Sequence, residues 1–199
     1  MSLYPAAAFL TSAAHSRQFP EDDGAEVAFA GRSNSGKSSA INAIVARRGL
    51  ARSSKTPGRT RLLNFFALRD GQRIVDLPGY GYAEASAAER ATWAPMIDAL
   101  AQRSSLRGLF VVVDSRRGLM EGDAGLLEWA AAARLPVHVL LSKADKLKRS
   151  EAREALQAAR KALPPDAGVQ LFSAQAPTGL DEARAVLDEW LGKKNAPVA

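Results

Sequence analysis

Residues 27–38 read Val-Ala-Phe-Ala-Gly-Arg-Ser-Asn-Ser-Gly-Lys-Ser. The last eight match the pattern G-x-x-x-x-G-K-[ST], in which backbone N–H groups curl around phosphate oxygens. A short apolar run precedes the match, and apolar residues follow it at helical spacing, at Ile41, Ile44 and Val45. A glycine-rich turn that joins a strand to a helix N-terminus is a natural anion site. The stretch therefore predicts an α/β domain that binds phosphate groups.

The rest of the chain alternates between strand-like and helix-like segments. Strands are expected over residues 27–30, 62–68, 73–76, 109–114, 137–141 and 169–172, and helices after the glycine-rich turn and over 86–100, 126–130, 151–163 and 186–191. The strands on either side of Asp70-Gly71 are close enough in sequence to form an antiparallel hairpin. The pattern predicts an α/β fold with a mostly parallel six-stranded sheet, one antiparallel strand, and helices on both faces.

Composition narrows the classes of function. The 199 residues include no cysteine, which excludes disulfide scaffolds, thiol nucleophiles, and cysteine-bound zinc or iron–sulfur sites. No apolar stretch approaches the roughly 20 residues that span a bilayer, and no Lys or Arg precedes the apolar run at the N-terminus, so we expect a cytoplasmic protein without a membrane partner. Lys and Arg outnumber Asp and Glu by 27 to 21, which indicates a polyanionic partner.

Further residues are expected near a bound phosphate chain. Lys37 is placed to reach the β and γ phosphates, and the Ser38 hydroxyl to ligate Mg²⁺. Asp76-Leu77-Pro78-Gly79 ends the third predicted strand, where D-x-x-G supplies a carboxylate near Mg²⁺ and a glycine N–H for the γ-phosphate. Between these motifs, Thr56 and Thr60 are both candidates for a hydroxyl that closes on Mg²⁺ when a γ-phosphate is present.

A second constellation predicts guanine. Ser142-Lys143-Ala144-Asp145 follows the strand expected over residues 137–141. The Asp145 carboxylate can accept hydrogen bonds from N1–H and N2–H₂ of guanine together. Adenine lacks both donors, and a site that leaves a carboxylate unpaired rejects it strongly. The Lys143 stem can lie over the base, and the Ala174 N–H can donate to guanine O6.

In this order the motifs resemble those of the P-loop GTPases, and five stretches are similar to signatures of the EngB family. These are Gly31–Asn34, Lys55–Thr60, Asn64–Phe66, Asp76–Ala83 and Val137–Leu141. The resemblance runs from about residue 26 to residue 191. It implies a three-layer Ras-like P-loop GTPase domain over residues 25–192, with an N-terminal extension over 1–24 and a C-terminal tail over 193–199.

Carried over residue by residue, the resemblance implies a set of nucleotide contacts. They are Gly31, Arg32, Ser33, Asn34, Ser35, Gly36, Lys37, Ser38, Gly58, Arg59, Thr60, Arg61, Leu62, Asp76, Leu77, Pro78, Gly79, Ser142, Lys143, Ala144, Asp145, Phe172, Ser173 and Ala174. The resemblance favours Thr60 over Thr56. It therefore implies Ser38 and Thr60 as Mg²⁺ ligands, and Lys37, Thr60 and Gly79 as the catalytic residues. Asn34 resembles the P-loop asparagine of potassium-stimulated relatives, which implies K⁺ as a second cation.

Two positions bear on activity. Ser142 stands where the family usually has Thr; it keeps the hydroxyl but loses a methyl, so we expect weaker tethering of the loops with guanine choice retained. Tyr80 follows Gly79, where signalling GTPases commonly carry a glutamine that orients the attacking water. We therefore expect slow intrinsic hydrolysis, with the site completed by a partner or a bound cation.

The resemblance implies a monomeric switch that binds GTP or GDP and acts in assembly of the large ribosomal subunit. Its partners would be that subunit or its precursor, including rRNA and ribosomal proteins. The alternative is an rRNA-binding or ribosome-binding module whose nucleotide is structural and scarcely hydrolysed. A nucleotide kinase is a weaker alternative, since Lys143 and Asp145 favour guanine and no lid for an acceptor substrate is evident.

Residues 40–69 carry a basic cluster without any Asp or Glu. It consists of Arg47, Arg48, Arg52, Lys55, Arg59, Arg61 and Arg69. Clustered charge of this kind binds RNA phosphates, and we expect it to contact rRNA around the nucleotide-responsive segment. Two other polar residues are expected to be structural: His138 lies within an apolar strand, and Asp114 is placed to cap the end of another.

Overall fold

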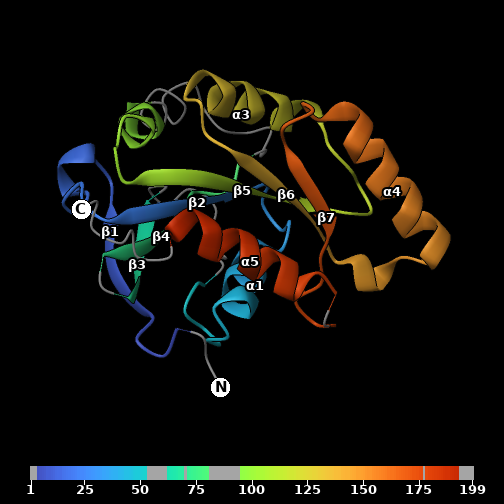
Figure 1. The fold of residues 1–199 in the computed structure, drawn as a ribbon, viewed down its shortest axis with the longest axis horizontal. Helices are drawn as coiled ribbons and strands as arrows, with labels where there is room; N and C mark the ends of the chain where they lie inside the picture. The colour runs from blue at the N-terminus through green and yellow to red at the C-terminus, as the bar shows by residue number, and fades with distance from the viewer. Residues whose placement is uncertain (1–3, 53–61, 70, 81–94, 177, 193–199) are drawn as a thin grey trace, which may run out of the picture.

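The computed structural model describes residues 4–52, 62–69, 71–80, 95–176 and 178–192. Its centre is a seven-stranded sheet in the order β1-β3-β4-β2-β5-β6-β7 (Figure 1). The strands are β1 (Ala8–Ala13), β2 (Ala25–Gly31), β3 (Leu63–Arg69), β4 (Gln72–Asp76), β5 (Leu106–Asp114), β6 (Val137–Ser142) and β7 (Gly168–Leu171). Only β3 runs against the others, pairing antiparallel with both β1 and β4. The predicted fold class, with one antiparallel strand, is confirmed.

Helices cover both faces of the sheet. Figure 1 shows α3 (Glu121–Ala132) and α4 (Arg149–Ala162) on one side, and α1 (Lys37–Ile44) and α5 (Leu180–Leu191) on the other. Side chains of a strand alternate between these faces, because successive residues point in opposite directions. On β2, Val27 and Phe29 face the α1/α5 core, whereas Ala28 and Ala30 face the α3 side. The near-continuous apolar run of this strand is explained by burial on both faces.

Local chemistry sets the ends of the helices. Gly36 precedes α1 with φ of 95°, a left-handed conformation that glycine adopts without a Cβ penalty. The α4 helix ends just before Pro164-Pro165, as expected, since proline cannot continue a helix. Residues 95–101 are helical, and Met96, Ile97 and Leu100 join the core on the α3 side. The predicted start of this helix, with Ser86 and Glu89 as a capping box, lies outside the described residues.

The sheet has one strand more than the six predicted, because residues 8–13 form β1 at its edge. This segment, within the expected N-terminal extension, pairs with β3 from Ala8 opposite Ala67 to Ala13 opposite Leu63. A bulge between Phe9 and Thr11 interrupts the register, and Phe9 remains 57% exposed. Such a short edge strand shows weak alternation in the sequence, because only one of its edges is paired and little of it is buried.

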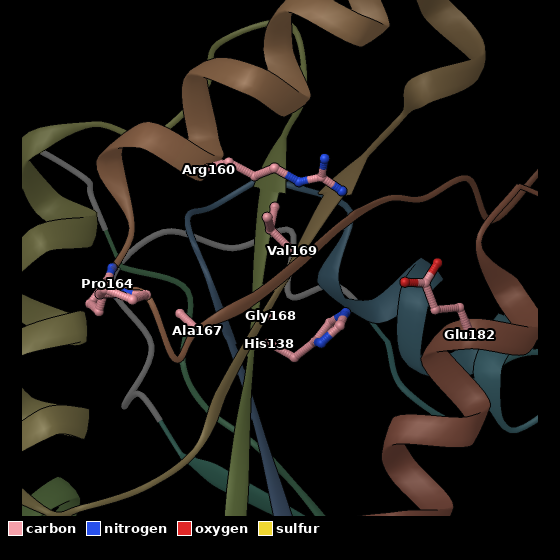
Figure 2. A pocket seen from close by; sticks show the side chains of 8 residues that line it. His138, Arg160, Pro164, Ala167, Gly168, Val169 and Glu182 are labelled. Carbon is pink, nitrogen blue, oxygen red and sulfur yellow. The ribbon is translucent and has the colours of Figure 1, made fainter.

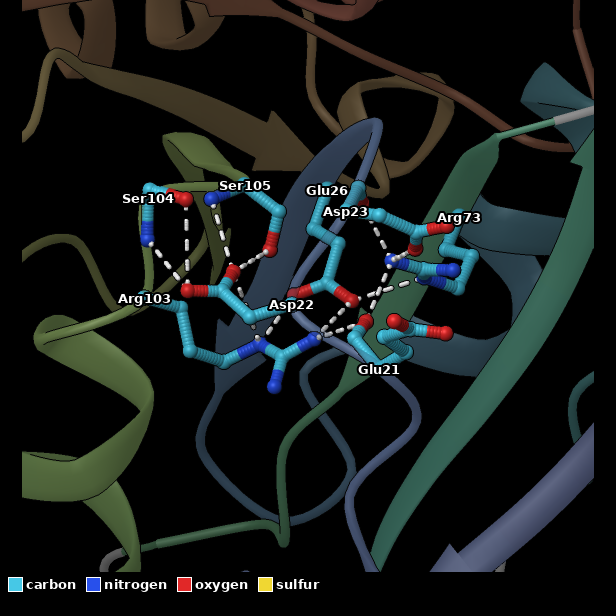
Figure 3. Close-up of polar contacts among 8 residues, drawn as sticks. All are labelled: Glu21, Asp22, Asp23, Glu26, Arg73, Arg103, Ser104 and Ser105. Carbon is cyan, nitrogen blue, oxygen red and sulfur yellow. Dashed lines mark hydrogen bonds and ion pairs between the residues drawn. The ribbon is translucent and has the colours of Figure 1, made fainter.

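An ionic network joins the strands at the end where the parallel strands begin (Figure 3). Glu26 of β2 is fully buried between Arg73 of β4 and Arg103, whose Nε atoms lie 2.7 Å from Oε1 and Oε2 respectively. Asp22 accepts hydrogen bonds from Ser104 and Ser105, and the Ser105 hydroxyl bond is the main reason that the pKa of this carboxyl is lowered. The acidic turn at residues 21–23 is therefore bound to the starts of β4 and β5.

None of the helices within the described ranges is long and apolar enough to cross a lipid bilayer.

The Glu26→Ala variant should lose about 3–5 kcal/mol of unfolding free energy, because it leaves two guanidinium groups without their shared buried carboxylate. Urea denaturation followed by circular dichroism measures the loss. Glu128→Ala is the matched control, since Glu128 is exposed on α3, and it should change stability by no more than about 0.5 kcal/mol. Equal stabilities of the two variants would contradict a stabilising role for the network.

Candidate functional site

The predicted motifs meet where the parallel strands end. Gly31 ends β2, Asp76 ends β4 and Ser142 ends β6, while Phe172 follows β7 directly. Since β2, β4, β5, β6 and β7 are parallel neighbours, these residues share one edge of the sheet. Open α/β sheets bind their ligands at this edge. The fold therefore gathers motifs that lie more than 140 residues apart in the chain.

The loop from Gly31 to Ser38, called the P-loop below, has a backbone conformation that few residue types can adopt. A Cβ added to Gly31 would lie 2.7 Å from the carbonyl oxygen of Val112 and 2.6 Å from Ser35 Oγ, so only glycine fits between them. Asn34 and Gly36 both have positive φ, at 63° and 95°. Successive left-handed and right-handed residues turn backbone N–H groups to the same side, forming a concavity suited to an anion.

Two charged residues meet beneath this loop. The Lys37 ammonium forms an ion pair with the Asp76 carboxylate, and both side chains are at most about one-tenth exposed. Burial raises the pKa of Asp76, while the charge of Lys37 opposes that rise. Asn64, opposite Asp76 on β3, accepts a 2.6 Å hydrogen bond from Ser12 of β1. The lysine and the D-x-x-G aspartate are thus side by side, a contact that the sequence alone did not predict.

The turn after Asp76 lies directly against the P-loop. A Cβ on Gly79 would lie 3.4 Å from the backbone of Ser33. Tyr80 forms an isolated parallel bridge with Arg32, in which its carbonyl accepts from Ser33 N at 3.0 Å. The Tyr80 hydroxyl donates a 2.6 Å hydrogen bond to Asp123 of α3, a contact that the sequence alone did not predict.

The predicted base motif is tied to the P-loop through side chains. The Ser142 hydroxyl donates to the carbonyl oxygen of Ser35 at 2.5 Å. The Lys143 ammonium donates to the carbonyl oxygen of Asn34 at 2.6 Å and lies 2.9 Å from the Asp114 carboxylate. Ser142 therefore tethers this motif to the P-loop through its side-chain hydroxyl.

Asp145 is held in place by the last motif. The Ser173 hydroxyl donates a 2.6 Å hydrogen bond to one carboxylate oxygen, and this bond lowers the pKa of Asp145. The Ala144 N–H donates to the carbonyl oxygen of Phe172 at 3.1 Å, so the two loops are also joined through their backbones. Ala174 is exposed just beyond Ser173. Asp145 is therefore ionised and oriented beside the loop that carries Ala174.

Asp114 makes more contacts at this edge of the sheet than the sequence predicted. Its carboxylate accepts from the N–H of Arg116 at 3.1 Å, which is the predicted strand-end cap. It also pairs with the Arg116 guanidinium at 2.6 Å and with the Lys143 ammonium, and the Arg116 hydrogen bond is the main reason for its lowered pKa. An aspartate at a strand end, followed by two arginines, was the only signal in the sequence.

Several predicted residues lie outside the described residues: Thr56, Gly58, Arg59, Thr60 and Arg61. Leu62 immediately precedes β3. The same limit applies to Lys55 within the basic cluster.

The described arginines of the basic cluster lie away from the P-loop. Arg47 follows α1, whose eight residues span about 12 Å from the P-loop end. Its guanidinium donates to the carbonyl oxygen of Pro5 at 2.9 Å, and that of Arg69 lies 4.6 Å from the centre of the Tyr4 ring. Arg48 and Arg52 are exposed in the same region, where two hydrogen bonds between Asn42 and the backbone of Ala51 fix the loop. The cluster thus borders the N-terminal segment.

A shallow pocket of about 480 Å³ lies at the opposite end of the sheet, near the starts of β6 and β7 (Figure 2). His138, Arg160 and Glu182 bring polar groups to it from three elements. His138 Nε2 is 2.9 Å from Gln170 Oε1, and the residue as a whole is only 8% exposed. The expectation of a packed structural histidine agrees with this geometry, and the pocket is separate from the gathered motifs.

Comparisons with known proteins agree with this geometry. Residues 26–143 match the family model described as "50S ribosome-binding GTPase". A protein from Coxiella burnetii (strain CbuK_Q154), named "Probable GTP-binding protein EngB", is 49% identical over 96% of this chain and 95% of its own length. A protein of the same name from Nitrosococcus oceani is 53% identical over 96% of this chain and 98% of its own.

Solved structures show the same fold. A crystal structure of a probable GTP-binding protein EngB aligns with a TM-score of 0.67 at 22% identity, covering 84% of this chain and 98% of that one. Era in complex with MgGDPNP and nucleotides 1506–1542 of 16S ribosomal RNA aligns with a TM-score of 0.63 at 19% identity, covering 89% of this chain and 60% of Era.

The stability of the protein should fall as the pH drops below about 6.5, partly because of His138. Burial lowers the pKa of this imidazole, so the folded state disfavours the proton that the unfolded chain accepts. Its contribution is complete above the unfolded pKa and is lost as the pH falls through the folded pKa. NMR titration should place the His138 midpoint below 6.5, and a midpoint above that value would contradict the expected effect.

Proposed function

The chain belongs to the EngB family of GTP-binding proteins, and we propose that it acts as a slow GTP-hydrolysing switch in assembly of the large ribosomal subunit. The observation that carries the proposal is the joining of three motifs at one sheet edge. Ser142 and Lys143 bind the P-loop backbone through their side chains, and Tyr80 bridges it through its backbone. The motif proposed to bind the base and the turn proposed to contact the γ-phosphate are both joined to the same loop. This arrangement suits a guanine nucleotide whose γ-phosphate is detected.

At the phosphate end, the chain's own groups have distinct proposed roles. On nucleotide binding, the Lys37 ammonium would move from the Asp76 carboxylate to the phosphate oxygens, or contact both, and so neutralise phosphate charge. The Gly79 N–H would donate to the γ-phosphate. The Ser38 hydroxyl in the first turn of α1 and the Asp76 carboxylate beside Lys37 are the hard oxygen donors that Mg²⁺ prefers. We propose Thr60 as the second Mg²⁺ ligand. When bound, Mg²⁺ would neutralise charge that develops on the phosphate oxygens.

Slow hydrolysis is supported by the surroundings of Tyr80. Its side chain cannot position water as a glutamine amide does, and its hydroxyl is already bonded to Asp123 at 2.6 Å. We propose that a partner or a cation completes the site. Asn34, whose carbonyl oxygen accepts from Lys143, is the residue that we propose for K⁺.

The partner is proposed to include ribosomal RNA. Arg48 and Arg52 supply exposed positive charge on a fixed loop, and the chain as a whole carries a net charge of +6. The matching family is described as ribosome-binding, and Era, which shares the fold, has been crystallised in complex with a segment of 16S ribosomal RNA. Phosphate contacts of this kind weaken as salt increases.

A second candidate function is a ribosome-binding module whose nucleotide is structural. The bond between Tyr80 and Asp123 favours it, because this bond occupies the hydroxyl of the side chain that follows Gly79. Turnover measured with and without large subunits separates the two: stimulated GTP hydrolysis supports the switch, whereas negligible turnover in both conditions supports the module.

Replacement of Asp145 by Asn should weaken GTP binding about 100-fold, because two hydrogen bonds from guanine to a charged acceptor are lost or reversed. Isothermal titration calorimetry measures the change, with ATP as the competing ligand. Asp166→Asn is the control, since Asp166 lies in an exposed turn away from this sheet edge. Unchanged GTP affinity in the Asp145 variant would contradict the proposed base contact.

Ribosome binding should depend on the nucleotide and on the exposed arginines. Co-sedimentation with large subunits is expected to differ between a GTP analogue, GDP and no nucleotide, and equal binding in all three would contradict a switch.

The Arg48→Ala/Arg52→Ala variant should bind large subunits less tightly and should show a slope of log affinity against log salt that is smaller by about two, with GTP affinity retained.

The control for that variant removes the same charge elsewhere. Arg149→Ala/Arg153→Ala changes two exposed arginines of α4 and should leave ribosome binding unchanged. Arg47 is kept in both variants because it holds the Pro5 carbonyl, and its loss would confuse charge with folding. Equal losses in the two variants would reduce the effect to net charge and would contradict a specific surface.

A further inference from the structure

Tyr80 joins three parts of the molecule that are separate in sequence. Its backbone bridges Arg32 in the P-loop, with Tyr80 N donating to the carbonyl oxygen of Gly31 at 3.3 Å and its own carbonyl accepting from Ser33 at 3.0 Å. Its side chain crosses to α3, where the hydroxyl donates to Asp123 Oδ1 at 2.6 Å. One residue therefore fixes the end of the D-x-x-G turn to both the P-loop and a helix.

The acceptor of this bond is held firmly. Asp123 is fully buried, and its second oxygen accepts from the N–H of Met120 at 2.7 Å, which caps the start of α3. Burial raises the pKa of Tyr80, so its hydroxyl keeps the proton that it donates. A carboxylate with both oxygens occupied and no exposure has little freedom to move, and it serves as a fixed anchor for the tyrosine.

The P-loop reaches the same junction from its other side. The Arg32 guanidinium approaches α3 closely enough that a Cβ on Gly122 would lie 3.1 Å from Nη1. Its charge also acts on the Tyr80 hydroxyl. Arg32, Tyr80 and Asp123 thus form a contiguous cluster that links the P-loop, the turn and the helix.

We propose that Tyr80 is a positioning residue, which holds the Asp76–Gly79 turn against the P-loop and thereby sets the preference for a nucleoside triphosphate over a diphosphate. This inference rests on the proposed contact between the Gly79 N–H and the γ-phosphate. An N–H that is fixed in advance binds its ligand without the cost of ordering the turn. A diphosphate makes no such contact, so its affinity does not depend on how the turn is held.

The test compares two tyrosine-to-phenylalanine variants. Tyr80→Phe removes the hydroxyl, leaves Asp123 with an unpaired oxygen, and should weaken binding of a non-hydrolysable GTP analogue about tenfold while GDP affinity stays within about twofold of wild type. Tyr4→Phe is the matched control, because the Tyr4 hydroxyl donates to Asp188 on α5 at 2.5 Å, away from the phosphate motifs. It breaks the same kind of bond and should leave the ratio of the two affinities unchanged.

Asp123→Asn supplies a conservative variant. Its amide oxygen can accept from Met120 while its amide nitrogen donates to the Tyr80 oxygen, so the ratio should stay near that of wild type. Thermal unfolding and GDP affinity verify that each variant is folded.

The outcomes separate this inference from the proposed function. Wild-type protein that binds neither nucleotide would overturn the proposed function. Wild-type protein that binds both, together with a Tyr80→Phe ratio equal to that of wild type, would overturn the positioning role alone. A similar change in the Tyr4→Phe variant would also overturn it, because a loss of stability would then account for the effect.

Discussion

The backbone path of the loop from Gly31 to Gly36 is the constraint on which the rest of the site depends. Gly31 fits between Val112 and Ser35 only because it lacks a Cβ, and this lets the loop close over the end of β2. Its carbonyl groups then become the acceptors for distant parts of the chain. Ser142 and Lys143 bind the carbonyl oxygens of Ser35 and Asn34. A change in the backbone of the loop therefore affects the motifs that are hydrogen-bonded to it.

The two ends of the sheet are built from different interactions. At the end where the parallel strands begin, Glu26 is enclosed by Arg73 and Arg103, and the acidic turn of residues 21–23 accepts further hydrogen bonds from Arg73. At the opposite end, the side chains of Ser142 and Lys143 bind backbone carbonyl groups of the P-loop. Ion pairs within the protein are present at both ends, but those at the second end, between Lys37 and Asp76 and between Lys143 and Asp114, lie among the motifs proposed to bind the nucleotide.

Prediction from sequence worked well where a residue's role follows from its neighbours in the chain. The spacing of Gly31, Gly36 and Lys37 identified the loop, and the apolar runs located six of the seven strands. It failed where a partner lies far away in sequence. The edge strand β1 has a single neighbour and weak alternation, and the bond between Tyr80 and Asp123 joins residues 43 positions apart. Arg47 belongs to a cluster that is close to the nucleotide-responsive segment in sequence, yet its partner is Pro5.

By itself, the sequence determined the local motifs of the protein: a G-x-x-x-x-G-K-[ST] loop, an aspartate in the turn after a buried strand that predicts guanine, and a basic surplus. These depend on residue type and local spacing, which determine backbone conformation and hydrogen-bonding capacity without reference to the fold. The tertiary structure alone decided that Tyr80 would be held by Asp123, that Lys143 would connect Asp114 with the P-loop, and that β1 would complete the sheet. Such contacts arise from packing of distant segments, where burial makes an unpaired polar group costly and so selects one partner among many.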